Sequence, residues 1–214
     1  MKTDNLIINF LGDSITQGCG ASSFEKGFVA LLKDALNLKE ARNYGVGGTR
    51  ISRQDGGDVS YNEDFCQRAE KMEDADAIVV FGGTNDYGHG TSPMGEFSDR
   101  TNYSFYGALH CLSQMLIKKY TGKPIIFMTP IHRKEEVNGG EGAKFGNHTL
   151  YDYVCAIKEV ARYYAIPVLD LYSVSMIQPQ EEYIREALCP DGLHPNDAGH
   201  RLIADRVKGF IKSL

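Results

Sequence analysis

The feature that most constrains the fold of this chain is an alternation of short apolar runs with longer segments of helical periodicity. Five brief runs, bounded by Gly, Pro or polar residues, are predicted to be strands: residues 6–11, 41–46, 76–82, 124–129 and 167–171. Such short runs are typical of strands that are covered on both faces. The alternation therefore predicts βαβ units stacked around a parallel sheet, an α/β fold.

Apolar residues between these runs recur at helical spacing and form faces suited to pack on a sheet. We expect helices over residues 24–36, 105–120, 150–164 and 196–214, with Pro195 or Asn196 suited to the first turn of the last one. The chain has no internal repeat, low-complexity linker or shift in composition that would mark a second domain. Residues 1–214 are therefore expected to form a single domain, because this length is enough for one sizeable core.

Composition narrows the partners that this chain could bind. With 23 Lys and Arg against 28 Asp and Glu, a net charge of −5 and no long basic run, nucleic acid is not an expected partner. The five cysteines are scattered without CxxC spacing, so we interpret them as reduced thiols. The apolar N-terminal run is broken by Asn9 and Asp13, unlike a signal peptide, and no stretch approaches the roughly 18 apolar residues of a membrane span. A cytoplasmic location and a small-molecule substrate are expected.

Two connections are longer than a compact domain usually needs, residues 84–102 and 131–147. Both follow predicted strands, so in a parallel sheet they would lie at its carboxyl edge, where open α/β sheets bind ligands. Their polar and aromatic side chains are candidate substrate contacts: Tyr87, His89, His132 and Arg133. The alternative for each connection is a solvent-exposed, flexible loop that has no role in binding.

Four polar clusters follow the predicted strands or precede the last helix: "GDSIT", "NYGVGGT", "GGTND" and "DGLHP". Acyl transfer needs a nucleophile, a base, a group that orients the base, and donors for the negative charge on the carbonyl oxygen. Ser14 could be the nucleophile and His194 the base, with Asp191 three residues earlier to orient the imidazole. Ser14 alone is more simply a cap or turn residue, Asp191 could be a turn residue, and His194 could equally have a structural role before a helix, so the prediction depends on their combination.

The remaining clusters could supply the oxyanion donors. Glycines in "GVGGT" let the backbone approach a substrate and aim an N–H at it, and the amide of Asn85 can donate without being ionised. The backbone N–H of Ser14 is a third candidate donor. Because the base must be neutral, activity is expected to rise with pH through the ordinary range of a histidine.

These clusters resemble, in order and spacing, the sequence blocks of the SGNH hydrolase superfamily, the GDSL-like lipases and acylhydrolases. The resemblance spans nearly the whole chain, from about residue 12 to about residue 200. It implies a three-layer α/β/α sandwich with a five-stranded parallel sheet in the flavodoxin-like order 2-1-3-4-5. It also implies serine esterase chemistry, with neither metal nor cofactor.

Carried over by position, the resemblance implies that Ser14 is the nucleophile, His194 the base and Asp191 the acid. The oxyanion donors match Gly48 and Asn85, together with the Ser14 backbone N–H, and Gly47 is the adjacent alternative to Gly48. One departure is Ile15, where the older motif has Leu. In the implied strand order, Ser14 and Asn85 would face each other across the point where the order reverses.

Several alternatives stay open at the level of the sequence. A short-chain or acetylated carbohydrate ester is the expected substrate, and a lysophospholipid or thioester is the alternative within the same fold. An α/β-hydrolase would have a GxSxG elbow, but Thr16 stands at the second glycine position. A metal-dependent phosphoesterase would need more His and carboxylate ligands than these clusters provide. A non-catalytic carbohydrate-binding module on the same scaffold is the remaining alternative, and "GVGG" lacks the spacing of a dinucleotide-binding motif.

Overall fold

Five parallel strands form one sheet in the computed structural model, which describes residues 1–53, 63–136 and 148–214. The strands are β1 (Ile7–Gly12), β2 (Glu40–Gly45), β3 (Ala77–Phe81), β4 (Ile125–Met128) and β5 (Val168–Leu169). Their order is β2-β1-β3-β4-β5, and every neighbouring pair is parallel. Each of the five predicted runs overlaps one of these strands, and the predicted strand order is confirmed.

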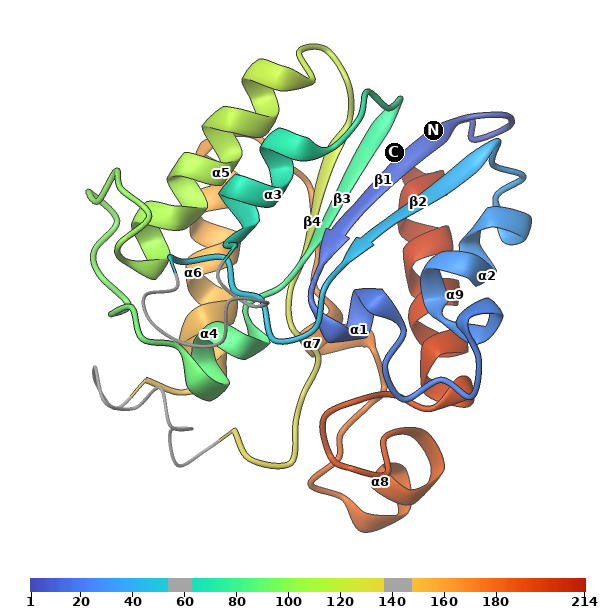
Figure 1. Ribbon diagram of the computed structural model, residues 1–214. Coiled ribbons are helices and arrows are strands. Elements are labelled where there is room, and N and C mark those ends of the chain that lie inside the picture. The colour runs from blue at the N-terminus through green and yellow to red at the C-terminus, as the bar shows by residue number, and fades with distance from the viewer. Residues whose placement is uncertain (54–62, 137–147) are drawn as a thin grey trace.

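Helices cover both faces of the sheet, so the predicted three-layer α/β/α architecture is confirmed (Figure 1). One face carries α2 (Phe28–Ala35) and α9 (Asp197–Ser213), and the other carries α3 (Phe65–Lys71), α5 (Phe105–Lys119) and α6 (Leu150–Tyr163). Alternate residues of a strand enter opposite layers. Phe10 of β1 packs edge-on against Phe28 of α2, whereas Leu11 joins the core under α3, α5 and α6.

The first predicted helix, residues 24–36, is wrong in its first turn. Residues Phe24–Lys26 form a short 3-10 helix, Gly27 is extended, and α2 begins at Phe28. Phe24 is 65% exposed and therefore does not belong to the apolar face on which it was placed. The prediction treated the two segments as one helix because it used only the spacing of apolar residues. An extended Gly27 redirects the backbone but leaves that spacing along the sequence unchanged.

The described residues form four further short helices at or near the carboxyl edge of the sheet, which is the lower edge in Figure 1. They are α1 (Ser14–Gln17), α4 (Thr84–His89), α7 (Leu171–Val174) and α8 (Glu182–Leu188). The sequence predicted none of them, since helices this short carry too little periodicity. Helix α4 occupies the start of the expected loop 84–102, while residues 137–147 of the expected loop 131–147 lie outside the described residues.

The two chain ends lie together at the opposite edge of the sheet, where the N-terminal amine donates to Ile211 O at 3.2 Å (Figure 1). The carboxyl edge, where open α/β sheets bind ligands, therefore lies away from both chain ends. Among the helices of the described residues, none has both the length and the apolarity to span a bilayer. The cytoplasmic location stays a prediction.

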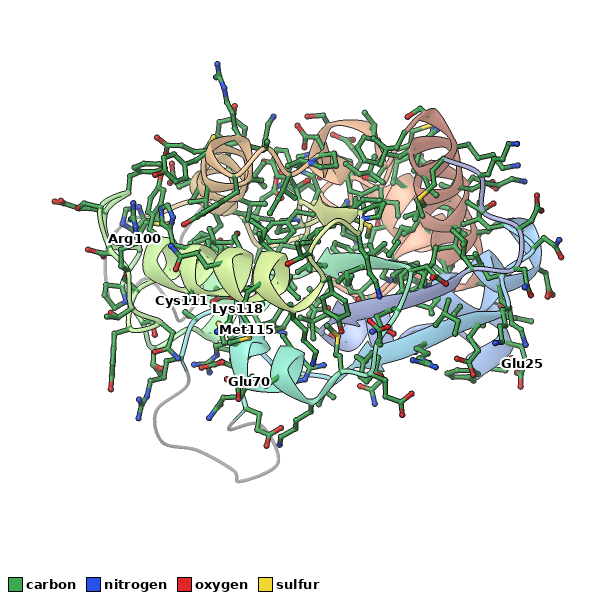
Figure 2. The ribbon with its side chains drawn as sticks, turned by 90° about the horizontal axis from the view of Figure 1, so that it is seen from above. Glu25, Glu70, Arg100, Cys111, Met115 and Lys118 are labelled. Atoms are coloured by element: carbon green, nitrogen blue, oxygen red, sulfur yellow. The ribbon has the colours of Figure 1, made fainter. Side chains whose placement is uncertain are left out.

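Helix α3 is held in its layer by α5. Figure 2 shows Glu70 of α3 next to Met115 of α5, while Glu25 lies at the other end of the molecule. This packing directs the largely buried Arg68 of α3 toward the turn that follows β2. Its guanidinium donates to Tyr44 O and, at 2.7 Å, to Thr49 Oγ1. Helix α3 thereby fixes the start of the loop that follows β2 at the carboxyl edge.

Candidate active site

Ser14 is the first residue of α1, immediately after β1 ends at Gly12. The preceding Asp13 caps the helix, because its carboxylate accepts the Ile15 N–H at 3.0 Å. A side chain at position 12 could not be accommodated, since its Cβ would lie 2.8 Å from the carbonyl oxygen of Phe81. The strand-to-helix turn therefore holds the serine at the carboxyl edge, with 7% of its surface exposed.

His194 and Asp191 come from one tight turn just before α9. Asp191 Oδ1 accepts the backbone N–H groups of Leu193 at 2.8 Å and His194 at 2.7 Å. Its second oxygen, Oδ2, lies 2.7 Å from His194 Nδ1, and His194 Nε2 lies 3.0 Å from Ser14 Oγ. Since the carboxylate can only accept, Nδ1 carries the ring proton and Nε2 is free to accept the proton of the serine hydroxyl.

The ionised form of Asp191 is stabilised mainly by the backbone N–H groups of this turn. Its side chain is 54% exposed. Although partial burial opposes ionisation, the two backbone N–H donors and the His194 ring hold the pKa of Asp191 below its ordinary value. The carboxylate is thus ionised at neutral pH and suited to orient the imidazole.

Asn85 reaches the same edge from α4, which follows β3 through Gly83 in a left-handed conformation (φ 107°). Its amide is buried; Nδ2 donates to Thr49 O at 3.0 Å, and Oδ1 lies 3.1 Å from His89 Nε2. An amide nitrogen carries two hydrogens, so one N–H remains for a ligand. Ser14 after β1 and Asn85 after β3 therefore flank the point where the strand order reverses.

The turn after β2 contains the two glycines considered as backbone donors. The Gly47 N–H donates to Gln17 Oε1 at 2.8 Å, and a Cβ on Gly47 would lie 3.6 Å from Ser14 Cβ. Gly48 adopts φ 74°, and its N–H has no partner among the described residues. The engagement of Gly47 favours Gly48 as the donor.

Two of the four expected substrate contacts face other parts of the protein. Tyr87 is only 2% exposed; its ring packs against Tyr153 and lies under the Arg133 guanidinium, so its expected place on the pocket wall is wrong. Helix α4 turns this side chain into the core instead of toward the edge. His89 is partly exposed, and its ring contacts Asn85 and Arg50.

The other two expected contacts, His132 and Arg133, follow β4 and are partly exposed. The His132 ring stacks on Tyr172 of α7 with centroids 3.7 Å apart, and its Nδ1 lies 2.8 Å from Glu136 Oε1. Arg133 donates to Thr84 O at 3.0 Å, next to Asn85 in the chain. Both residues thus lie at the carboxyl edge, and their hydrogen bonds are to residues other than the serine, histidine and aspartate.

Sequence reasoning overlooked the two carboxylates beneath the site. Burial raises the pKa of Asp13 to about 6, against the opposing effects of the Ile15 N–H and the nearby His194. Burial also raises the pKa of Asp86, although this carboxylate accepts the backbone N–H groups of Ile51 and Ser52 and the Ser52 hydroxyl. Their adjacency to Ser14 and Asn85 in "GDS" and "TND" was the available signal.

The described residues contain no group of three or more His, Cys, Asp or Glu side chains arranged to hold a metal ion. All five cysteines lie in this described part, and none of them is paired. What the carboxyl edge does contain is a hydroxyl, an imidazole and a carboxylate in hydrogen-bonded sequence, with an amide donor nearby.

Comparison with known proteins identifies one matching family and several similar proteins. The model of the GDSL-like Lipase/Acylhydrolase family matches residues 10–202. An acetylxylan esterase of Xylanibacter ruminicola is 25% identical over 225 residues, which cover 99% of this chain; the chain spans only 44% of that protein. A solved structure from Lactobacillus plantarum is 30% identical with a TM-score of 0.85, covering 100% of this chain and 98% of that one. A possible lipase of Chitinophaga pinensis, 24% identical with a TM-score of 0.72 and 98% coverage of both chains, shares the fold.

Proposed function

This chain belongs to the GDSL-like Lipase/Acylhydrolase family, which places it among the carboxylic ester hydrolases, and on that premise we propose that it is a serine esterase with Ser14 as nucleophile. One observation carries the proposal. Ser14 Oγ, the His194 ring and Asp191 are joined by contacts of 3.0 Å and 2.7 Å. This is the arrangement that converts a weakly nucleophilic hydroxyl into an attacking group.

In the acylation step, Ser14 Oγ attacks the ester carbonyl carbon while His194 Nε2 takes the hydroxyl proton. The carbonyl π electrons move onto oxygen, and Asn85 Nδ2 and the backbone N–H groups of Gly48 and Ser14 donate to that oxyanion. When the C–O bond to the alcohol breaks, His194 returns the proton to the leaving oxygen. Water then attacks the acyl-enzyme by the same route and releases the carboxylic acid.

Asp191 acts on the ring rather than on the substrate. Its ionised carboxylate keeps the proton on Nδ1 and stabilises the imidazolium that forms during attack. The turn that carries both residues supplies the orientation, since backbone N–H groups hold Oδ1 while Oδ2 faces the ring.

The substrate we propose is a short-chain ester, with an acetylated carbohydrate as the favoured class. Support comes from the acetylxylan esterase that is 25% identical over nearly the whole chain. It also comes from the carboxyl edge itself, where the partly exposed rings of His132 and Tyr172 and the Arg133 guanidinium combine flat apolar faces with polar groups. A lysophospholipid or thioester is the alternative.

Labelling with a fluorophosphonate probe tests the nucleophile. The wild-type chain and a control, Ser23→Ala, in which an exposed serine is removed, should be labelled, and Ser14→Ala should not. Labelling that persists in Ser14→Ala contradicts the proposed nucleophile. A panel of p-nitrophenyl esters from acetate upward, run beside acetylated xylo-oligosaccharides, tests the substrate: kcat/KM should fall as the acyl chain lengthens, and a rise would favour the lipid alternative.

A further inference from the structure

Two side chains, His89 and then Arg50, lie in hydrogen-bonded sequence behind the Asn85 amide. His89 stands one helical turn after Asn85 in α4, and its Nε2 lies 3.1 Å from Asn85 Oδ1. On the other side of the ring, His89 Nδ1 lies 2.9 Å from an Nη of Arg50. Arg50 comes from the loop after β2, so helix α4 and this loop meet at the histidine.

The hydrogen-bond partners of His89 determine which of its ring nitrogens carries the proton. A guanidinium only donates, so His89 Nδ1 must accept and carry no hydrogen. In a neutral imidazole the proton is then on Nε2, which donates to Asn85 Oδ1. The Asn85 oxygen is thereby fixed toward His89, and its Nδ2 faces Thr49 O and the catalytic edge.

The opposite orientation of the amide fails at both of its ends. If Asn85 were flipped, its oxygen would oppose the carbonyl oxygen of Thr49, an acceptor against an acceptor. Its NH2 group would at the same time face the Nε2 hydrogen of His89, a donor against a donor. Both losses would occur in a buried environment, where an unmade hydrogen bond costs about 1–3 kcal/mol.

Arg50 is itself held in place by its surroundings. The side chain is buried, and its Nη1 donates to Thr91 Oγ1 at 3.1 Å. The buried Asp86 accepts the backbone N–H groups of Ile51 and Ser52, the residues that follow Arg50. Burial lowers the pKa of Arg50, and the charge of Asp86 partly offsets this effect. The positively charged guanidinium of Arg50 is therefore held in one position beside His89.

We propose that His89, with its tautomer set by Arg50, is the positioning residue that orients the Asn85 amide for the oxyanion. The inference rests on the proposed serine esterase function. A hydrogen bond to the amide oxygen also polarises the amide N–H, so the same contact that orients the donor strengthens it. His89 thus acts through Asn85, and it is not a substrate contact.

Steady-state kinetics of four variants test this role: His89→Ala, His89→Gln, Asn85→Ala and the double variant His89→Ala/Asn85→Ala. Loss of an oxyanion donor lowers turnover by about 100- to 1,000-fold, so a donor that is present but no longer oriented should cost about 10-fold in kcat, with KM changed less than about 2-fold. Glutamine, whose amide can donate to Asn85 and accept from Arg50, should restore most of the rate.

The double variant separates positioning from a general structural effect. If His89 acts through Asn85, adding His89→Ala to Asn85→Ala should lower kcat by less than about 2-fold further. An equal loss in both backgrounds, or full activity of His89→Ala, overturns the inference. A wild-type chain that hydrolyses none of the esters overturns the proposed function instead.

Nitrogen NMR of the His89 ring tests the orientation without any turnover. In the Ser14→Ala variant, the ¹⁵N shifts should report a protonated Nε2 and an unprotonated Nδ1. In Arg50→Met this preference for one tautomer should weaken. A proton on Nδ1 in the presence of Arg50 contradicts the assignment, whatever the enzyme's activity.

Discussion

The two halves of the site are built in contrasting ways. The proton-transfer half, Asp191 and His194 facing Ser14, takes two of its members from one turn, and its acid is half exposed. The oxyanion half is buried and brings Asn85 of α4 together with Arg50 and Thr49 from the turn after β2. The acid and base of the first half are therefore paired by neighbouring residues, whereas the second half exists only when α4 packs against that turn.

The halves also differ in how they treat charge. Backbone N–H donors and the His194 ring keep the pKa of Asp191 low although the group is partly buried. Below the oxyanion half, burial dominates and raises the pKa of Asp86, as it raises that of Asp13 under the serine. A turn can thus stabilise an ionised acid near the surface, while a packed interior opposes ionisation. Variants in each half should consequently fail in different ways.

Removing the base should have the largest effect. His194→Ala leaves Ser14 without a proton acceptor, so kcat for a p-nitrophenyl acetate-type ester should fall by about 10⁴-fold or more. The melting temperature should change little, because the ring is partly exposed. Residual activity within 10-fold of wild type would contradict the assignment of the base.

The second-largest effect is expected when only the charge of Asp191 is removed. In Asp191→Asn, Oδ1 can still accept the two backbone N–H groups, but an NH2 group faces His194 Nδ1 and moves the ring proton to Nε2. We expect kcat to fall by about 10³- to 10⁴-fold with an unchanged fold, which circular dichroism can check. A loss below 10-fold would mean that the exposed acid has a smaller part than its geometry indicates.

In the oxyanion half, Asn85→Ala should lower kcat by about 100- to 1,000-fold while the proton-transfer half stays intact. Phosphonylation of Ser14 by a fluorophosphonate should still be detectable at a reduced rate, because the serine remains activated. Equal losses for Asn85→Ala and His194→Ala would remove the distinction between the two halves.

The smallest effect on rate, but a clear one on stability, is expected for Asp13→Asn. The pKa of Asp13 is raised to about 6 in the folded protein, above its value in the unfolded chain, so the folded state binds this proton more tightly. Its stabilising contribution is complete below about pH 4 and is lost as pH rises through about 6.

Asparagine can still accept the Ile15 N–H and has no charge to bury. Relative to wild type, Asp13→Asn should therefore gain about 2 kcal/mol in free energy of unfolding between pH 4 and pH 7. Urea unfolding at both values measures this. A difference between the two proteins that is the same at both pH values would show that burial does not perturb this carboxyl.

The parallel α/β class was predictable because strand length and helical periodicity are local patterns. The strand order and the three layers followed from the family that the four polar clusters resemble. Prediction failed where two patterns merged, as at Gly27, or where a helix was too short to show a period, as in α4. Tyr87 and His89 were assigned to a loop facing substrate for that reason. In the structure the helix turns Tyr87 into the core and His89 toward Asn85.

The sequence by itself determined the pairing of Asp191 with His194, since three residues and a turn glycine bring acid and base together through local hydrogen bonds. It also determined that Ser14 and Asn85 follow strands, and hence share one edge of the sheet. Only the tertiary structure decided that Arg50 reaches His89, which way the Asn85 amide points, and that Asp13 is buried. These features depend on contacts between distant segments and on exclusion of water, which residue spacing along the chain does not encode.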